Sequence, residues 1–282
     1  MATELLVLMF LKMQLAGTGA ILLVLLLRYP ARRHIGAELS YRLWAIVPAA
    51  AAASLVPTLP LFMQFDDAKT DVLMGSSPVV WGPVLRHVPA LALLWLAGAL
   101  VLAGLFLLAD MRFQRRVSKG LAGPAITGAW PRMVVPSDYR TRFSEAERVL
   151  IREHEREHMA RRHPTANLVI AVMQVISWFN PLAHMAAACA RMDQELACDA
   201  AVVARRPRQR GEYARTLLKA HASHTGSPFA CALAAGRRHP LEVRVAMLAK
   251  PRISVRRDVI GVFVVGALAV GLAVALWSLA PL

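Results

Sequence analysis

The stretch of sequence that decides the fold is Ser144–Pro164, which reads SEAERVLIREHEREHMARRHP. Ser144 stands three residues before Glu147, and this spacing is a capping box, which predicts that a helix begins at Ser144. Pro164 cannot continue a helix without the loss of a backbone hydrogen bond, so we expect the helix to end at about His163. The sequence therefore predicts one charged helix over residues 144–163.

This helix contains the motif HEREH, which runs from His154 to His158. Residues i and i+4 lie on one helix face, so both imidazoles can reach the same metal ion. Glu155, beside the first histidine, is placed to take a proton from metal-bound water. The motif predicts a zinc site. On its own it leaves open the alternative of a solvated, charged helix that carries two histidines.

A catalytic zinc ion needs a third protein ligand and keeps one position for water. We reject His163, because it follows His158 by five residues and would lie on the wrong side of a continuing helix. A better candidate is Glu195, on a second helix that we expect to run to about Ala204. Asn180 and the proline after it predict the start of that helix, since Asn caps helices and Pro suits the first helical position. The predicted metal ligands are His154, His158 and Glu195.

Asp199 follows Glu195 by four residues and shares its helix face. It can accept the second ring N–H of a ligand histidine and so fix the orientation of that ring. The alternative is a pair of surface carboxylates, but residues of buried type flank both, and carboxylates there need a charged partner. Cys198 is interpreted as a packing residue, because two histidines, one glutamate and a water molecule already fill a tetrahedral zinc site.

The composition indicates a membrane protein. The chain has 282 residues, of which 57% are hydrophobic and 18% charged, and its mean hydropathy is +0.46. A soluble domain carries nearer a quarter of charged residues, so this apolar surplus is too large for one water-soluble globule. The same hydrophobicity excludes a disordered chain, and three cysteines exclude a disulfide scaffold.

Four apolar stretches have the length of about 20 residues that a membrane-spanning helix needs. They cover residues 5–27, 43–63, 90–109 and 259–279. We therefore expect three transmembrane helices within residues 1–110, a separate domain over residues 111–257, and a fourth transmembrane helix with a short tail in residues 258–282.

A fifth apolar stretch, residues 168–179, is not counted as a span. At 1.5 Å per residue it reaches only ~18 Å, which is too short to cross the hydrocarbon. A crossing would also separate His154 from Glu195. We expect this stretch to turn back at Trp178–Pro181 and to form a core or membrane-surface helix, with the site at or slightly within the inner membrane face.

Charge placement predicts the orientation. The net charge is +15, and residues 111–257 hold 26 of the 33 basic and 11 of the 18 acidic side chains. Positive charge favours the cytoplasmic side, so we expect this segment in the cytoplasm and both termini outside. The segment has no aromatic-interleaved basic motif and no zinc-finger spacing, so attraction to the anionic inner leaflet is favoured over direct binding of nucleic acid.

The ordered set of motifs resembles the BlaR/MecR family of membrane zinc metallopeptidases, which includes the β-lactam-responsive signal transducers. The set comprises PRMVVP at residues 131–136, HEREH, RRHP at 161–164, WFNP at 178–181 and ELACD at 195–199, and the likeness covers about residues 120–250. The resemblance implies gluzincin-type chemistry, with His154, His158 and Glu195 on zinc, Glu155 as general base and Asp199 behind the ligands.

The resemblance also implies self-cleavage and action, direct or indirect, on a cytoplasmic transcriptional repressor in the regulation of antibiotic resistance. Three features depart from the family. Arg156 and Glu157 replace small or apolar residues, and His163 stands where Asp is common. The chain ends about three residues after the fourth apolar stretch, so we expect no penicillin-binding sensor domain.

The sequence thus predicts a mainly α membrane protein with four transmembrane helices. A helical, gluzincin-like cytoplasmic zinc peptidase domain is expected between the third and fourth spans. The expected location is a bacterial cytoplasmic membrane, the expected cofactor is Zn²⁺, and the expected partners are the lipid bilayer and a protein substrate. The sequence leaves open whether the protein forms a homodimer. The alternatives are a non-enzymatic signal transducer with a structural or degenerate zinc site, and a membrane quality-control protease.

Overall fold

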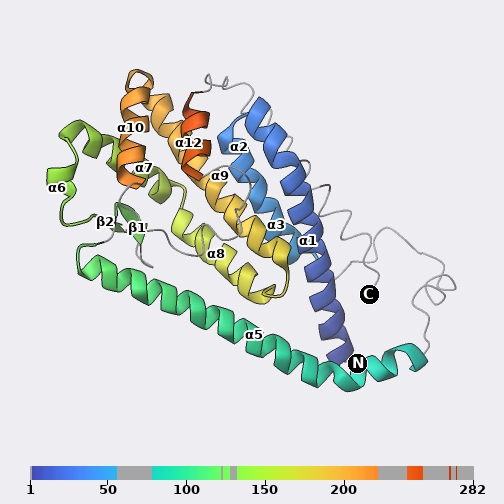
Figure 1. Cartoon of the computed structure of the whole chain (residues 1–282). Coiled ribbons are helices and arrows are strands. Elements are labelled where there is room, and N and C mark those ends of the chain that lie inside the picture. The colour runs from blue at the N-terminus through green and yellow to red at the C-terminus, as the bar shows by residue number, and fades with distance from the viewer. Residues whose placement is uncertain are drawn as a thin grey trace.

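The computed structural model describes residues 2–55, 78–121, 123–127, 132–221 and 240–249, with two isolated positions at 267 and 271. These residues form a mainly helical fold with one two-stranded sheet (Figure 1). In chain order the elements are α1 (Ala2–His34), α2 (Ala37–Arg42), the 3₁₀ helix η1 (Leu43–Ala45), α3 (Ile46–Ala53), α5 (Pro78–Ser118), β1 (Ala125–Thr127), β2 (Arg132–Val134), α6 (Tyr139–Arg142), α7 (Glu145–Ala160), α8 (His163–Ile176), α9 (Pro181–Arg205), η2 (Pro207–Gln209), α10 (Arg210–His221) and α12 (Pro240–Leu248).

Two helices, α1 and α5, are long and apolar enough to cross a membrane. The apolar parts are Met9–His34 and Val88–Ser118, and they contain most of the first and all of the third predicted span. Leucines cover the outside of α5, where Leu93 is 68% and Leu100 is 63% exposed. Such a surface is unfavourable in water and suits contact with lipid.

The second predicted span is not one helix in the described residues. The chain from residue 37 to residue 53 forms α2, η1 and α3 in succession, and α3 ends at Ala53. Ile46 and Ala50 are 2% and 3% exposed, in a core that α1, α2, α3, α8 and α9 build together. This segment therefore supports the other helices. Residues 56–63 lie outside the described residues, as does the fourth predicted span except at positions 267 and 271.

The start of α7 is confirmed, but its predicted end is wrong. Ser144 accepts a hydrogen bond from the Glu147 backbone, and the Glu147 side chain accepts one from Ser144 N, which completes the capping box. The helix ends at Ala160, because Arg162 adopts a left-handed conformation with φ 53°. A new helix, α8, begins at His163, since proline is tolerated in the first turn of a helix.

The apolar stretch after α7 turns back as predicted. Helix α8 ends at Ile176, and α9 begins at Pro181 with Asn180 as its N-cap, whose Oδ1 accepts from Leu182 N at 3.0 Å. The two helices pack against each other as a hairpin, and α9 also contacts α1, α2, α7 and α12. Helix α9 is therefore the centre of the fold.

Residues Arg132–Val134, within the sequence PRMVVP, form the short strand β2. It pairs antiparallel with β1, with Ile126 opposite Met133, a strand that the glycine- and proline-rich sequence did not reveal. A second core lies near this sheet, between α7, α9, α10 and α12, and contains Leu150, Val202 and Tyr213. Both helices that carry the predicted metal ligands are held by this core.

Candidate metal site

Helices α7 and α9 bring the three predicted metal ligands together. The Nε2 atoms of His154 and His158 lie 3.1 Å apart. One carboxylate oxygen of Glu195 is 3.4 Å from His154 Nε2, and the other is 3.5 Å from His158 Nε2. The three donor groups therefore face one point between the two helices.

These separations fit a tetrahedral zinc ion. Zinc bonds of about 2.0–2.1 Å at tetrahedral angles place ligand atoms roughly 3.3–3.4 Å apart. Two imidazoles and one carboxylate are also the donor set of many catalytic zinc sites. The side chains of His154 and His158 are 9% and 14% exposed, whereas 33% of the Glu195 side chain is open to solvent. Water can thus reach the fourth position.

Asp199 lies behind His154, where the sequence predicts it. Its Oδ1 is 3.3 Å from His154 Nδ1. The hydroxyl of Tyr213 lies between the same groups, 2.9 Å from His154 Nδ1 and donating to Asp199 Oδ1 at 2.7 Å. Together they fix the imidazole so that its Nε2 faces the site.

Arg244 on α12 is the charged partner that the two carboxylates need. It donates to both oxygens of Asp199, at 2.8 and 2.7 Å, and its Nη1 lies 2.8 Å from Glu195 Oε2. Burial favours the neutral acids, but Arg244 outweighs it. The pKa of Asp199 is lowered to about 2, and that of Glu195 is held well below its usual range. Both groups are therefore carboxylates.

The electrostatics of the site favour a positive charge between the histidines. Burial lowers the pKa of His158 to about 4. At His154 burial acts in the same direction, but hydrogen bonds to Asp199 and Glu195 outweigh it and raise the pKa to about 10. The two carboxylates thus favour a positive charge beside His154, and a divalent metal ion bound by the histidines would supply one.

Arg244 and Tyr213 were not predicted from the sequence. A signal for Arg244 exists, because a single arginine in the apolar run Val243–Leu248 must find carboxylates when it is buried. Arg244 is 7% exposed. No comparable signal marks Tyr213, which is 1% exposed and belongs to the second core.

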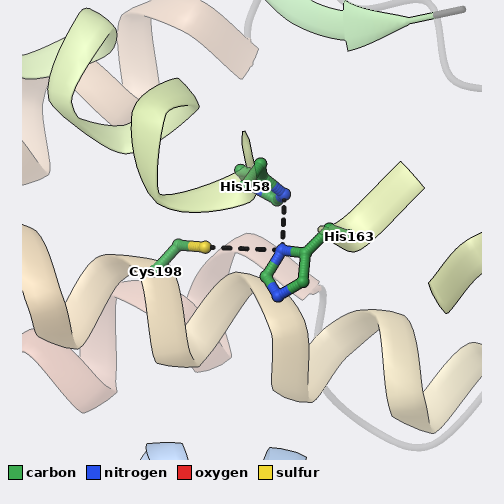
Figure 2. A group of neighbouring side chains, drawn as sticks. All are labelled: His158, His163 and Cys198. Carbon is green, nitrogen blue, oxygen red and sulfur yellow. Dashed lines mark hydrogen bonds between the residues drawn. The ribbon is translucent and has the colours of Figure 1, made fainter. Parts of the chain in front are cut away.

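His163 lies next to His158 and Cys198, as Figure 2 shows. Its Nδ1 is 2.9 Å from Nδ1 of His158 and 3.7 Å from Sγ of Cys198. The reason given for rejecting it as a ligand is wrong, because α7 ends before His163 and the new helix α8 returns it to the site. His158, His163 and Cys198 form a second cluster of potential metal donors that shares His158 with the first.

Two glutamates of the motif have different surroundings. Glu155 is 8% exposed and is not among the three converging donors. Glu157 is 5% exposed and accepts hydrogen bonds from Arg161 and from Arg205 on α9. This buried ionic contact joins α7 to α9 and accounts for a charged residue at position 157.

The described residues also line an apolar cavity of about 560 Å³ between α1, α3, α8 and α9. Ala183, Ala187 and Ala190 form its wall on α9, and Gln194 lies at the end nearest the metal site. None of the three converging donors lines it, so this cavity is distinct from the candidate metal site.

Span-length apolar helices and a cluster of two histidines and one glutamate are features expected of a membrane metallopeptidase. The family model described as BlaR1 peptidase M56 matches residues 8–120 and 107–248. The chain therefore belongs to the M56 peptidase family. The matched residues include most of α1, all of α5 and all five predicted site residues. A search of curated proteins found no match.

Proposed function

We propose that the protein is a zinc-dependent endopeptidase of the bacterial cytoplasmic membrane, with His154, His158 and Glu195 as the zinc ligands. The observation that carries this proposal is the convergence of the two Nε2 atoms and the Glu195 carboxylate at separations of 3.1–3.5 Å. Membership of the M56 family supports the peptidase activity.

In this proposal each residue of the site has a separate role in peptide hydrolysis. The zinc ion, when bound, supplies Lewis-acid polarisation of the scissile carbonyl and of the attacking water. Glu155 takes the proton from this water as general base and can return it to the leaving amine. Asp199 and Tyr213 hold His154 in its ligating orientation, and Arg244 keeps Glu195 ionised.

The proposed role is regulated proteolysis in signal transduction. The substrates we propose are the chain itself, a cytoplasmic transcriptional repressor, or both, and the family's signal-transducing members support this role. The basic segment 111–257 would face the cytoplasm, and the chain would cross the bilayer several times. An accessibility tag at Arg208 should then be reached only from the cytoplasmic side, and a tag at the N-terminus only from outside.

The decisive test replaces Glu155 with Gln in the full-length protein. Glu155→Gln should retain zinc, because no ligand changes, and should lose proteolysis. Glu195→Ala should instead lose zinc. Proteolysis at the native rate in Glu155→Gln would overturn the assignment of the base, and unchanged zinc content in Glu195→Ala would place the third ligand elsewhere.

The alternative function is a non-enzymatic transducer. The charged residues Arg156 and Glu157 within the motif favour this alternative. In the structure Glu157 forms ion pairs with Arg161 and Arg205, so packing explains one of these two residues. A signalling phenotype that survives Glu155→Gln would favour this alternative. A quality-control protease would instead keep its phenotype without any dedicated repressor.

A further inference from the structure

We infer that α8 and α9 form a re-entrant hairpin, which enters the bilayer from the face that carries the metal site and turns inside the half of the hydrocarbon farther from it. The partner that this surface fits is the lipid hydrocarbon itself. The inference rests on the proposed crossing of the membrane by α1 and α5. It does not depend on zinc or on proteolysis.

Contacts with helix α1 give a first measure of how deep the turn between α8 and α9 lies in the bilayer. Ser177 Oγ donates to Gln14 Oε1, and Asn180 Nδ2 donates to Thr18 Oγ1, both at 2.9 Å. The apolar part of α1 runs from Met9 to His34, with Arg28, Arg32 and Arg33 towards its end and a single lysine, Lys12, near its start. Gln14 and Thr18 lie in its first half. The turn is therefore level with the half of α1 that is farther from the basic, cytoplasmic end.

Contacts with helix α5 give a second, independent measure of the depth of this turn. Trp95 Nε1 donates to the carbonyl of Ile176, and Trp178 Nε1 donates to the carbonyl of Trp95, both at 3.0 Å. Trp95 lies near the start of the apolar part Val88–Ser118, and the basic residues Arg115 and Arg116 lie at its end. The contacts with α1 and with α5 thus both place the turn in the half of the membrane farther from the basic ends of these helices. Figure 1 shows the α8–α9 hairpin between α1 and α5.

The other end of α9 lies at the basic end of α1. Arg28 donates to both oxygens of Asp193, at 2.9 and 3.1 Å. From Asn180 to Asp193 the helix rises about 20 Å at 1.5 Å per residue, out of ~30 Å of hydrocarbon. Glu195 follows Asp193 by one turn at most. The metal site therefore lies near the cytoplasmic face, and the turn lies well inside the bilayer.

Several backbone groups of the turn have the hydrogen-bond partners that hydrocarbon requires. Irregular backbone at membrane depth is tolerated only where other groups satisfy its hydrogen bonds. The carbonyl of Ile176 accepts from Trp95, and the carbonyl of Trp178 lies 2.9 Å from His184 Nε2. Asn180 N donates to the Ser177 carbonyl, and the Asn180 carbonyl accepts from Ala183 N. These bonds come from side chains on α5 and α9 and from the backbone of the turn itself.

Helix α8 and the turn have no charged side chain to expose. No Asp, Glu, Lys or Arg occurs between Pro164 and Asn180. Leu168, Val172 and Phe179 are 64%, 48% and 50% exposed. In water these side chains would form an unfavourable apolar surface, whereas in hydrocarbon they need no further protein partner.

The test is cysteine accessibility in the full-length chain, with Cys189, Cys198 and Cys231 replaced by Ala. Single cysteines are placed at Phe179 and Val172, at Leu94 on α5 as a membrane marker, and at Leu218 on α10 as a water-exposed marker. All four native side chains are at least 48% exposed, so no core contact is lost. A charged maleimide is given access to both faces of the membrane.

Phe179→Cys and Val172→Cys should react as slowly as Leu94→Cys, at least about tenfold more slowly than Leu218→Cys, because hydrocarbon excludes the charged reagent. A nitroxide at position 179 should also show the same depth as one at position 94. Labelling of Phe179→Cys at the rate of Leu218→Cys, with Leu94→Cys protected, would overturn the hairpin and leave the spans intact. Rapid labelling of Leu94→Cys as well would overturn both. Loss of zinc or of proteolysis should change neither the labelling rates nor the nitroxide depth, so a failure of the proposed function can be told apart from a failure of the hairpin.

Discussion

Tyr213 shows how one hydroxyl group serves two members of the site. It donates to Asp199 and contacts the ring nitrogen of His154 that faces away from the metal position. Tyr213→Phe should lower the free energy of unfolding by about 1.5–3 kcal/mol, the range for a buried hydrogen bond to a charged group. It should also weaken zinc binding, because His154 is then held less firmly. Denaturant unfolding and competition with a chelator measure the two effects.

The matched control is Tyr29→Phe, since Tyr29 is 61% exposed and its hydroxyl has no role in the site. This variant should behave as the native protein in both measurements. Native zinc affinity in Tyr213→Phe would mean that Asp199 alone orients His154.

His163 gives a second prediction for a single residue. Its Nδ1 can accept the N–H of His158, the ring nitrogen not aimed at the metal position. His163→Ala should therefore weaken zinc affinity about 10- to 100-fold, the usual cost of losing a partner behind a ligand. His163→Asp should keep most of the affinity, because a carboxylate can accept the same hydrogen bond. Met159→Ala, a change in an exposed neighbour, is the control.

If His163→Ala bound zinc as tightly as the native protein, the contact with His158 would have no role in metal binding. A second equivalent of metal that disappears in Cys198→Ala would instead show that His158, His163 and Cys198 form a site of their own.

The converging residues of the site could be predicted, because local rules place them. His154 and His158 share a face by helix geometry, and Glu195 shares a face with Asp199 for the same reason. The sequence can mark Arg244 as a buried arginine that needs carboxylates, but not which ones, because its helix lies about 45 residues after Asp199 and only tertiary packing decides where that helix lies. His163 was misjudged because one left-handed residue, Arg162, separates it from the helix of the motif.

At the scale of elements, the contact between α5 and the α8–α9 turn depends on a glycine. A Cβ atom built on Gly98 would lie 2.2 Å from the indole ring of Trp178. Gly98→Ala should therefore push α5 away from the turn and lower the thermal midpoint of the solubilised protein. Gly104→Ala is the matched control on the same helix, because nothing lies within 4 Å of its Cβ position.

Trp178→Leu should restore much of the loss in Gly98→Ala, since it removes the ring that the added methyl group meets. Equal midpoints for Gly98→Ala and Gly104→Ala would contradict close packing of the two elements.

The link between α1 and α9 gives a further prediction at this scale. Asp193 is fully buried, and its carboxylate accepts from Arg28 and, at 2.8 Å, from the indole N–H of Trp44. Asp193→Asn leaves Arg28 without its counter-charge and should cost about 3–5 kcal/mol of stability. Asp138→Asn is the control, because its pair with Arg142 at 3.6 Å is exposed and should contribute about 0–1 kcal/mol. A similar loss in both variants would contradict a special role for the buried pair.

Elements with strong end signals were predicted, and those without them were not. The capping box of α7 and the Asn-Pro start of α9 gave correct helix starts. The second predicted span stays a prediction, because only residues 43–55 of it are described, and hydropathy does not separate a lipid-facing helix from a buried one. Ile46 and Ala50 are apolar because they face other helices. Strand β1 has only three residues, too few for an alternating pattern.

At the scale of the whole molecule, α9 joins two environments. Its first half packs with α8 against the span-length helices, and its second half carries Glu195 and Asp199 among α7, α10 and α12. A metal ion held by α7 and α9 would therefore crosslink only one end of this helix. The other end is held by contacts with α1 and α5 that do not involve the metal.

This arrangement predicts that metal removal acts on one part of the molecule. A ligand that binds the folded state stabilises it by about 2.7 kcal/mol at 100 times its dissociation constant, and local stability rises most where the crosslink lies. Chelation should speed amide hydrogen exchange in α7, α12 and residues 193–205. Residues 163–185 should keep their native exchange rates. Glu195→Ala, measured without chelator, should reproduce this pattern. Uniformly faster exchange along the whole of α9 would instead mean that the hairpin and the site unfold as one unit.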